Sequence, residues 1–432
     1  MKITPALPRR LRLDASPEEA ATRLRALPGL VWLDTAGNLP ETDADGGISL
    51  ITAAPRAVLR GHLSDPGPLE KALAELNASQ AAQVDWGFPS AGLFGSVDFD
   101  GHYSFGVYDE VLIHRHATRE WLATGPRLPG ALNSLPSPAA SPTSNPDPPA
   151  GAVVAFKSEL SRERYEAMVR RAQDYIAAGD IYQVNLAHAF SADWPEGADA
   201  LAFARRLRSF SPAPYAAYLE LGGRQVVSSS PESFLKMSGS LIRTRPIKGT
   251  RPRHRDAAAD ERSSVELLRS DKERAELLMI TDLERNDLGQ VCEYGSVRVT
   301  DLIKLERYEQ VFHLVSTVQG TLLPGVSHPA ALAACFPGGS ITGAPKKRAG
   351  EIIAELEGRP RGLYTGAIGY FGANGESQFS IAIRTVVIQD GRAEFQAGAG
   401  IVADSVPALE WEETLHKAAG ILTAAADGGG HE

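Results

Sequence analysis

The chain beyond residue 160 carries apolar residues first at helical spacing and then at strand spacing. Ser161 can cap a helix and Gly179 can end it. Between them the apolar positions recur every three or four residues, at Tyr165, Met168, Val169, Ala172 and Ile176. In residues 181–186 the period becomes two, so that Tyr182, Val184 and Leu186 share one face of a strand and Gln183 and Asn185 the other. The pattern therefore predicts a helix followed at once by a strand.

Two longer segments read as antiparallel meanders. In residues 215–250, Gly222-Gly223 and Ser238-Gly239 separate β-rich runs, and in residues 364–402 the turns are Asn374-Gly375 and Asp390-Gly391. Helical patterns cover about 258–287, 327–335, 345–357 and 407–424. This order predicts an α+β fold of large packed antiparallel sheets flanked by helices, and not a doubly wound parallel sheet.

Residues 131–150 are rich in Pro, Ser and Ala and are predicted to form a linker or long surface loop. They separate an N-terminal region, 1–130, from a larger domain, 151–428. In the N-terminal region, residues 29–33, 48–52, 93–97 and 108–113 resemble strands. No strong candidate site occurs there.

Composition and charge exclude several classes of protein. The 432 residues are 43% hydrophobic and 22% charged, as in ordinary globular proteins. Cys292 and Cys335 form no disulfide framework or metal cluster. We find no signal segment and no apolar run long enough for a bilayer, and we expect a cytoplasmic protein without membrane contact. A net charge of −9 argues against a nucleic-acid partner, so an anionic ligand would need a local cationic pocket.

Lys248 is a candidate nucleophile. It lies between Pro246 and Gly249, with four arginines within five residues, in the segment 243–253. Neighbouring cations and burial both disfavour an ammonium ion, so we expect its pKa to be lowered. The alternative is a solvated basic strand edge.

Two predicted helices carry paired carboxylates. Glu273 and Glu276 share one helical face, and Glu410 and Glu413 share a stripe with Lys417. The two pairs could converge on one Mg²⁺, because this cation prefers oxygen ligands. For either helix alone, a solvated face with salt bridges explains the pattern as well.

Other polar and glycine-rich positions are candidate contacts. Residues 337–346 contain a glycine-rich turn with Ser340, which could receive a carboxylate or phosphate although it lacks the P-loop lysine. Glu232 precedes the strand leading to Lys248 and could be a general acid or part of an ion pair. His313 lies in an apolar run typical of a core histidine, and Gly400 could bring backbone amides to an anion or serve tight packing.

Taken in order, six motifs resemble the chorismate-utilising enzymes, whose known fold is that of anthranilate synthase component I. They occupy residues 180–186, 230–234, 246–253, 273–289, 337–346 and 398–405. The resemblance is close over residues 155–425 and loose before the linker, where the sequence at 93–99 departs from the usual motif. It implies that residues 151–428 form a chorismate-binding catalytic domain.

Within this family, two positions favour the aminodeoxychorismate synthase branch, which leads to para-aminobenzoate and folate. The resemblance implies that anthranilate synthases carry alanine where this chain has Lys248. It also implies that isochorismate and salicylate synthases place a water-activating lysine where this chain has Gln183, and an amide cannot act as that base. Anthranilate synthase component I is the alternative enzyme, and a non-catalytic regulatory subunit is a third possibility.

The resemblance further implies a mechanism and partners. Lys248 would attack chorismate while Glu232 protonates the departing hydroxyl, and ammonia from a separate glutamine amidotransferase subunit would then displace the lysine. Mg²⁺ would be held by Glu276 and Glu413, with Glu273 and Glu410 behind them. The implied substrate contacts are Gln183, His313, Ser340, Tyr364, Arg384, Gly400 and Lys417.

Overall fold

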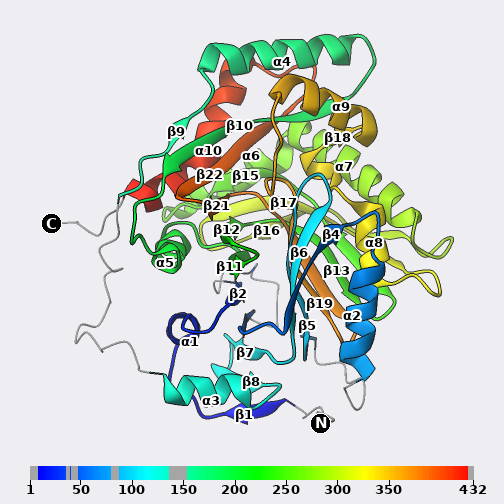
Figure 1. Ribbon diagram of the computed structural model, residues 1–432. Helices are drawn as coiled ribbons and strands as arrows, with labels where there is room; N and C mark the ends of the chain where they lie inside the picture. Colours follow the sequence, from blue (N-terminus) through cyan, green and yellow to red (C-terminus); the bar gives the residue numbers. More distant parts are fainter. Residues whose placement is uncertain (1–7, 36–38, 40–46, 79–86, 136–152, 427–432) are drawn as a thin grey trace.

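The computed structural model describes residues 8–35, 39, 47–78, 87–135 and 153–426. Two large sheets face each other, and helices cover their outer faces and one end (Figure 1). Every strand pairing between described residues is antiparallel. No described helix combines the length and the apolar character that crossing a membrane requires.

The 12-stranded sheet follows the order β1-β8-β7-β3-β2-β11-β12-β21-β22-β10-β18, with β9 beside β10. Its strands from the first third of the chain are β1 (Arg9–Leu11), β2 (Val31–Asp34), β3 (Ile48–Thr52), β7 (Leu112–Arg115) and β8 (Glu120–Ala123). The later strands are β9 (Lys157–Ser158), β10 (Gln183–Asp193), β11 (Tyr215–Leu221), β12 (Arg224–Ser230), β18 (Gly343–Ala344), β21 (Thr385–Gln389) and β22 (Arg392–Ile401).

The 10-stranded sheet follows the order β15-β17-β14-β13-β20-β19-β5-β6-β4, with β16 beside β17. Its early strands are β4 (Ala57–His62), β5 (Gly92–Val97) and β6 (His102–Tyr108). The later ones are β13 (Ser233–Ser238), β14 (Leu241–Arg245), β15 (Ile247–Pro252), β16 (Arg298–Arg307), β17 (Val311–Thr321), β19 (Ala367–Gly372) and β20 (Glu376–Ile381). Both sheets therefore combine strands from before and after residues 131–150.

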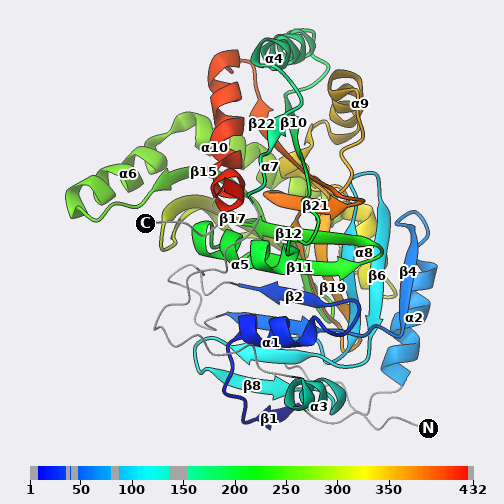
Figure 2. The same cartoon turned by 60° about the vertical axis from the view of Figure 1, so that its left-hand side comes forward.

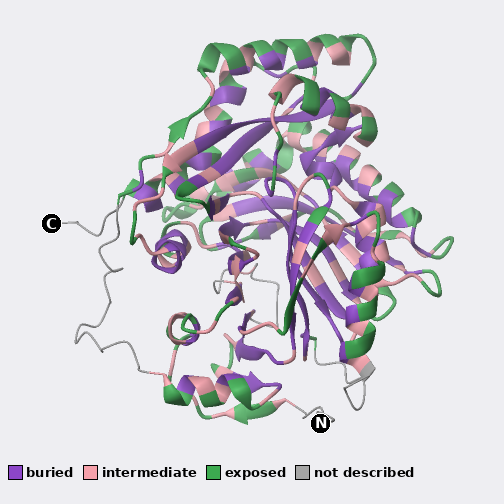
Figure 3. Ribbon diagram, in the orientation of Figure 1, coloured by how far each residue is buried: buried purple, intermediate pink, exposed green. Residues whose placement is uncertain are grey.

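The helices surround the sheets. The early ones are α1 (Pro17–Leu24), α2 (Gly67–Ala78) and α3 (Arg127–Ser134); the later ones are α4 (Arg162–Ala177), α5 (Ala200–Phe210), α6 (Ala257–Arg269), α7 (Asp271–Gly289), α8 (His328–Cys335), α9 (Lys346–Glu357) and α10 (Pro407–Ala426), with the short 3-10 turn η1 at Gly339–Ile341. Figure 2 shows α6 projecting from the body beside β15. Figure 3 shows buried residues concentrated in the strands and exposed residues on the outer helix faces.

The buried apolar residues form separate clusters, one between the two sheets and others between each sheet and its helices. Phe94, Tyr108, Leu219 and Tyr370 belong to a buried cluster contributed by both sheets. Further clusters pack α1, α3, α5 and α10 against the 12-stranded sheet and α2, α7 and α8 against the 10-stranded sheet. The strands are thus buried on both faces at their centres, as expected for sheets covered by helices.

Much of the predicted secondary structure is confirmed. Ser161 caps α4, and the predicted strand is β10, which starts at Gln183 and not at residue 181. The predicted hairpin turns at Gly222-Gly223, Asn374-Gly375 and Asp390-Gly391 all join paired strands. The α+β class with large antiparallel sheets is therefore correct.

Several expectations about elements need correction. Both predicted meanders divide between the sheets, since β11, β12, β21 and β22 lie in the 12-stranded sheet and β13 to β15, β19 and β20 in the 10-stranded one. The helical segment 258–287 breaks at Ser270, which ends α6 and caps α7. The long strands β16 and β17 were not predicted, and residues 108–113 span the end of β6 and the start of β7.

The predicted linker also differs at its beginning. Helix α3 extends to Ser134, so residues 131–134 are helical. Leu128 and Leu132, one turn apart, are both buried and give α3 an apolar face. Residues 136–150 of that segment lie outside the described residues.

Candidate active site

A cavity of about 640 Å³ lies where the two sheets meet α7 and α10. Among the residues proposed from the sequence, those that line it are Glu232, Lys248, Glu273, Glu276, His313, Ser340, Tyr364, Arg384, Gly400, Glu413 and Lys417. Gln183 and Glu410 lie buried just behind this lining. The fold thus brings together residues as far apart in the chain as Glu232 and Lys417.

Lys248 reaches the cavity from β15 because of a β-bulge. The register of β15 against β17 shifts between Lys248 and Thr250, and Gly249 at the bulge has φ +74°. A Cβ atom on Gly249 would lie 2.7 Å from Leu267 Cδ1. Only glycine combines this backbone conformation with so close an approach. The bulge places Lys248 Nζ 3.8 Å from Glu276 Oε2.

Three of the four arginines around Lys248 in sequence are paired with carboxylates. Arg245 is paired with Glu306, Arg251 Nε lies 3.0 Å from Glu266 Oε1, and Arg253 Nε lies 3.0 Å from Asp260 Oδ1. The cationic setting expected from the sequence is therefore balanced by carboxylates in the fold.

Glu232 is a buried carboxyl group at the end of the turn between β12 and β13. Burial raises the pKa of Glu232, while the Ser340 hydroxyl and the Lys248 ammonium act in the opposite direction without reversing the shift. Ser340 comes from η1, which lies next to Glu232. A carboxyl group that retains its proton beside a cation is suited to donate that proton to a leaving group.

The four glutamates of α7 and α10 converge on one side of the cavity. Burial raises the pKa of Glu276, and repulsion by Glu273 and Glu413 adds to the shift. Burial likewise raises the pKa of Glu410, with Glu413 adding to it. Such mutual repulsion requires the carboxylates of both helices to be neighbours.

Lysine side chains balance these carboxylates in the described conformation. Lys272 Nζ lies 4.0 Å from Glu276 Oε1 and 3.8 Å from Glu410 Oε1. Burial alone would raise the pKa of Glu413, but Lys417, with its Nζ 2.7 Å from Glu413 Oε1, lowers it on balance. No three acidic, imidazole or thiol groups among the described residues are arranged as a ready metal cage. The donor set fits a hard divalent cation in kind, because it offers several carboxylate oxygens that already need a counter-charge.

Arg384 offers a cation to an anionic ligand. It lines the cavity, and no described carboxylate forms an ion pair with it; burial lowers the pKa of its guanidinium. Its planar fork can hold two oxygens of one carboxylate. Lys417, from α10, also faces the cavity and donates a hydrogen bond to the Gly398 carbonyl at 2.9 Å.

Glycines on β22 make room for polar groups at the inner wall. A Cβ atom on Gly400 would lie 2.8 Å from Gln183 Nε2 and 3.5 Å from Lys248 Nζ. A Cβ atom on Gly398 would lie 2.8 Å from the Tyr364 hydroxyl. Gln183 is fully buried, and neither polar atom of its amide has a hydrogen-bond partner in the described structure. An amide in this state is available to a bound ligand.

His313 lines the cavity from β17. Its Nδ1 lies 3.0 Å from Thr250 Oγ1, and burial together with Arg384 lowers the pKa of His313 to about 4. The ring is therefore neutral at physiological pH and can both donate and accept a hydrogen bond.

The sequence interpretation did not assign several residues that line the cavity: Asn185, Thr250, Arg251, Lys272, Gln396 and His416. For three of them, the position in the sequence relative to other site residues could have indicated a place in the cavity. Asn185 shares the strand face of Gln183, Thr250 lies two residues after Lys248, and Lys272 precedes Glu276 by one helical turn. Arg251 was considered only as one of the arginines around Lys248, and Gln396 and His416 carried no signal.

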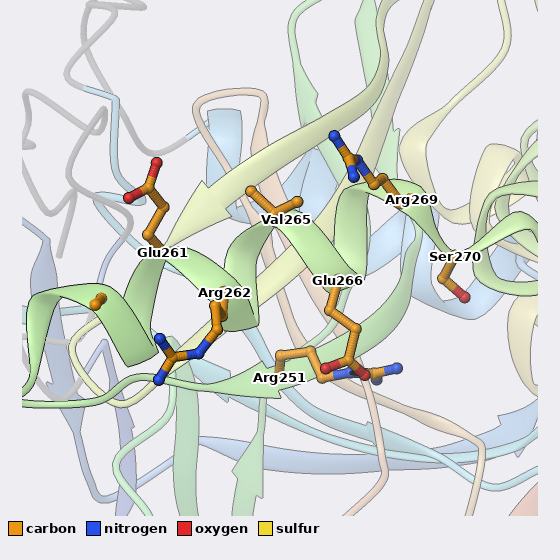
Figure 4. Close-up of a pocket in the computed structure, with 8 residues that line it drawn as sticks. Arg251, Glu261, Arg262, Val265, Glu266, Arg269 and Ser270 are labelled. Atoms are coloured by element: carbon orange, nitrogen blue, oxygen red, sulfur yellow. Dashed lines mark hydrogen bonds and ion pairs between the residues drawn. The ribbon is translucent and has the colours of Figure 1, made fainter.

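A more open groove of about 870 Å³ follows α6 (Figure 4). Its lining includes Arg262, Val265, Glu266 and Arg269, and Arg251 borders both this groove and the cavity. The Arg251–Glu266 ion pair bridges β15 and α6. The groove thus runs along a charged face of α6, at the side of the cavity.

Residues 89–423 match the family model of the chorismate binding enzymes. The match covers most of the chain and includes every residue of the cavity described above. The chain therefore belongs to the chorismate-binding enzyme family.

Relatives in this family carry two different names. Anthranilate synthase component 1 of Streptomyces coelicolor is 45% identical over 341 residues, covering 74% of this chain and 66% of that protein. The same enzyme component of Thermus thermophilus is 49% identical, over 64% of this chain and 59% of its own length. Aminodeoxychorismate synthase component 1 of Bacillus subtilis is 46% identical, over 61% and 56%. The chain thus spans less than two thirds of the length of these curated relatives.

Solved structures confirm the predicted fold. Anthranilate synthase component I from Streptococcus pneumoniae has a TM-score of 0.76 and 30% identity, covering 89% of this chain and 93% of that one. The menaquinone-specific isochorismate synthase from Escherichia coli also has a TM-score of 0.76, with 18% identity over 98% and 95%, and shows the likeness of fold alone.

Proposed function

We propose that this chain aminates chorismate with ammonia to give 4-amino-4-deoxychorismate, the reaction of an aminodeoxychorismate synthase. The observation that carries the proposal is the position of Lys248 at the inner wall of the cavity, beside Gly400 and Gln183 and on the same cavity as Glu232. A lysine there supplies a nucleophile, and its neighbours supply an acid and space for a ring.

In the proposed reaction, Lys248 loses its ammonium proton to solvent and attacks C2 of chorismate as the free amine. Glu232 gives its proton to the hydroxyl oxygen at C4, which leaves as water. Ammonia then adds at C4, the bond from C2 to Lys248 breaks with its electron pair returning to the lysine nitrogen, and the new ammonium group at C4 returns a proton to Glu232. Because a carboxyl group with a raised pKa holds its proton until the hydroxyl departs, Glu232 is suited to this step.

The substrate would be oriented by the cations and polar groups around the ring. Arg384 would bind one carboxylate through its fork, and Lys417 and Tyr364 would contact a carboxylate from the opposite side. His313 and Ser340 would lie near the ring, with Gly400 leaving room for it. Gln183 would offer an amide instead of a base, which disfavours activation of water.

We also propose that Mg²⁺ binds at Glu276 and Glu413, with Glu273 and Glu410 behind them. The ion would supply positive charge for a substrate carboxylate in a protein of net negative charge. The support is the convergence of buried carboxylates from α7 and α10.

Ammonia would come from a separate glutamine amidotransferase subunit. Burial raises the pKa of Cys292 to about 11 and raises that of Cys335 further, so neither thiol is suited to be the thiolate that attacks glutamine. This supports ammonia delivery from another chain.

A second candidate is anthranilate synthase, favoured by the names of several of the most similar relatives. Incubation with chorismate, Mg²⁺ and an ammonium salt separates the two. We expect a product with the mass of aminodeoxychorismate, which a lyase converts to para-aminobenzoate. A fluorescent aromatic amine formed without a lyase would instead identify anthranilate synthase.

A further inference from the structure

A buried glutamate behind the cavity is not used by the proposed mechanism. Glu284 of α7 is 2% exposed, and its carboxyl group accepts a hydrogen bond from the Gly339 amide at 3.0 Å and from the Thr244 hydroxyl at 3.4 Å. Gly339 begins η1, the turn that carries Ser340 into the cavity. Glu284 therefore supports this turn from the side opposite the substrate.

The contact is close enough to define the turn. A Cβ atom on Gly339 would lie 3.2 Å from Glu284 Oε1 and still closer to Leu283, so the backbone of η1 packs directly on α7. The far end of the turn is held separately, because Arg361 Nη1 donates to the Ile341 carbonyl at 3.2 Å. Loss of Glu284 would release the end of η1 that precedes Ser340.

Charged groups surround Glu284 on several elements. Asp287 lies one turn further along α7 and is paired with Lys346 of α9, Nζ to Oδ2 2.5 Å. Cys335 of α8 and Glu232 also interact with the Glu284 charge. Burial, with repulsion from Asp287, raises the pKa of Glu284 to about 7. The group thus titrates in the physiological range although it is buried.

We propose that Glu284 is a positioning residue: by accepting the hydrogen bond of the Gly339 amide, it fixes η1 so that the Ser340 hydroxyl reaches Glu232, the acid of the proposed reaction. The proposal rests on the proposed acid role of Glu232. It extends the site by one layer, from the cavity lining to the helix behind it. Because Glu284 touches neither substrate nor reacting atoms, its effect acts through Ser340 and Glu232.

Two substitutions test whether the contact with the Gly339 amide is what matters. Glu284→Gln retains an acceptor for the Gly339 amide but has no charge, whereas Glu284→Met has similar length and leaves that amide unpaired. Asp282→Asn, at an exposed position on the same helix, is the matched control. Initial rates of chorismate loss give kcat and KM from pH 6 to pH 9, and separate product analysis records which amine forms.

We expect Glu284→Gln to keep kcat and KM within about twofold, because its amide oxygen still accepts the hydrogen bond from the Gly339 amide. We expect Glu284→Met to lower kcat by about tenfold or more with little change in KM, and to move the basic limb of its kcat profile to higher pH, because the Ser340 hydroxyl that lowers the pKa of Glu232 is displaced. Asp282→Asn should match the unaltered protein.

A fall of about tenfold or more in the kcat of Glu284→Gln would overturn the proposal, even if Glu284→Met fails to fold, and an unchanged kcat and profile in Glu284→Met would overturn it as well. If the product is anthranilate, the proposed function fails while the shift of the profile still tests Glu284, because chorismate loss is measured independently of the product. Absence of chorismate loss in the unaltered protein with Mg²⁺ and ammonium would reject both.

Discussion

Lys248 is the residue at which the proposed chemistry differs most sharply from that of the alternative. Chorismate without ammonia should leave a mass adduct on the peptide that contains Lys248, because the lysine then has no ammonia to displace it. The adduct should be absent in Lys248→Ala and present in Lys236→Ala, on β13. Mass spectrometry of the intact protein and its peptides provides the measurement.

The conservative exchange at this position is equally informative. Lys248→Arg should lose at least about a thousandfold in kcat, because guanidinium stays protonated and cannot attack. Near-normal turnover in this variant would show that the lysine is only an electrostatic contact and that ammonia adds directly, as the anthranilate-type alternative requires.

The buried charge of Glu284 should also affect stability. Its pKa of about 7 lies above that of a glutamate in an unfolded chain, so the folded state binds this proton more tightly. The stability contribution of the protonated group is complete below pH 4.5 and is lost as pH rises toward and past 7.

Glu284→Gln should remove this fall in folding stability with rising pH, because the amide does not titrate. Relative to the unaltered protein, its Tm should be similar at pH 5 and higher at pH 8, with a difference in unfolding free energy of about 1 to 3 kcal/mol. Thermal unfolding followed by circular dichroism at both pH values measures it. A Tm difference that does not change between pH 5 and pH 8 would contradict this prediction.

Among the elements, β15 depends on its bulge. Gly249→Ala should destabilise the fold by about 1 to 3 kcal/mol, because alanine is strained at φ +74° and its Cβ meets Leu267. It should also reduce turnover by displacing Lys248. Gly350→Ala, in the middle of α9 with open space around it, should instead stabilise by about 0.5 to 1 kcal/mol. Denaturant titration of both variants provides the comparison.

Helices α7 and α10 should act together through a divalent cation. Glu413→Gln should abolish turnover and weaken Mg²⁺ binding by at least about tenfold, since one oxygen ligand is lost. Calorimetric titration with Mg²⁺ measures binding without substrate. Glu351→Gln, at an exposed position on α9, should bind Mg²⁺ normally. Full turnover in the presence of a chelator would reject the metal proposal.

The sequence predicted elements with local signals more successfully than elements that depend on distant partners. Ser161, Gly222-Gly223 and Asn374-Gly375 mark α4 and two hairpins through caps and turns alone. β16 was missed because it alternates between exposed and partly buried residues, and its charged side chains weaken the apolar pattern. Its partner β17 was missed with it. These two segments are strands because they pair with each other, and local sequence does not reveal that pairing.

The residues of the candidate site also divide into those marked by local sequence and those that depend on distant segments. The segment around Lys248 and the glutamate pairs indicated part of the cavity lining by themselves, whereas Tyr364 and Arg384 came only from the family resemblance. The ion pairs that balance Arg245, Arg251 and Arg253 come from distant segments and could not be read from the local sequence. Glu284 likewise becomes notable only once α7 packs against η1.

For the whole molecule, the clearest test of the proposed function is which nitrogen source the purified chain can use. Because both cysteines are buried with raised thiol pKa values, the purified chain should use ammonium salts and should not use glutamine. Product formation with each nitrogen source, measured by mass, gives the answer. Hydrolysis of glutamine by the chain alone would contradict the need for a separate subunit.

The sheets join strands that are far apart in the chain. Val97 of β5 pairs with Ala367 of β19, and Trp32 of β2 pairs with Tyr218 of β11. During synthesis on the ribosome, β5 therefore emerges about 270 residues before its neighbour β19, at a cost in time of tens of seconds. Until then its edge is open to other strands. The nascent N-terminal region is consequently a natural client for chaperones, and truncated chains that end before β19 should aggregate.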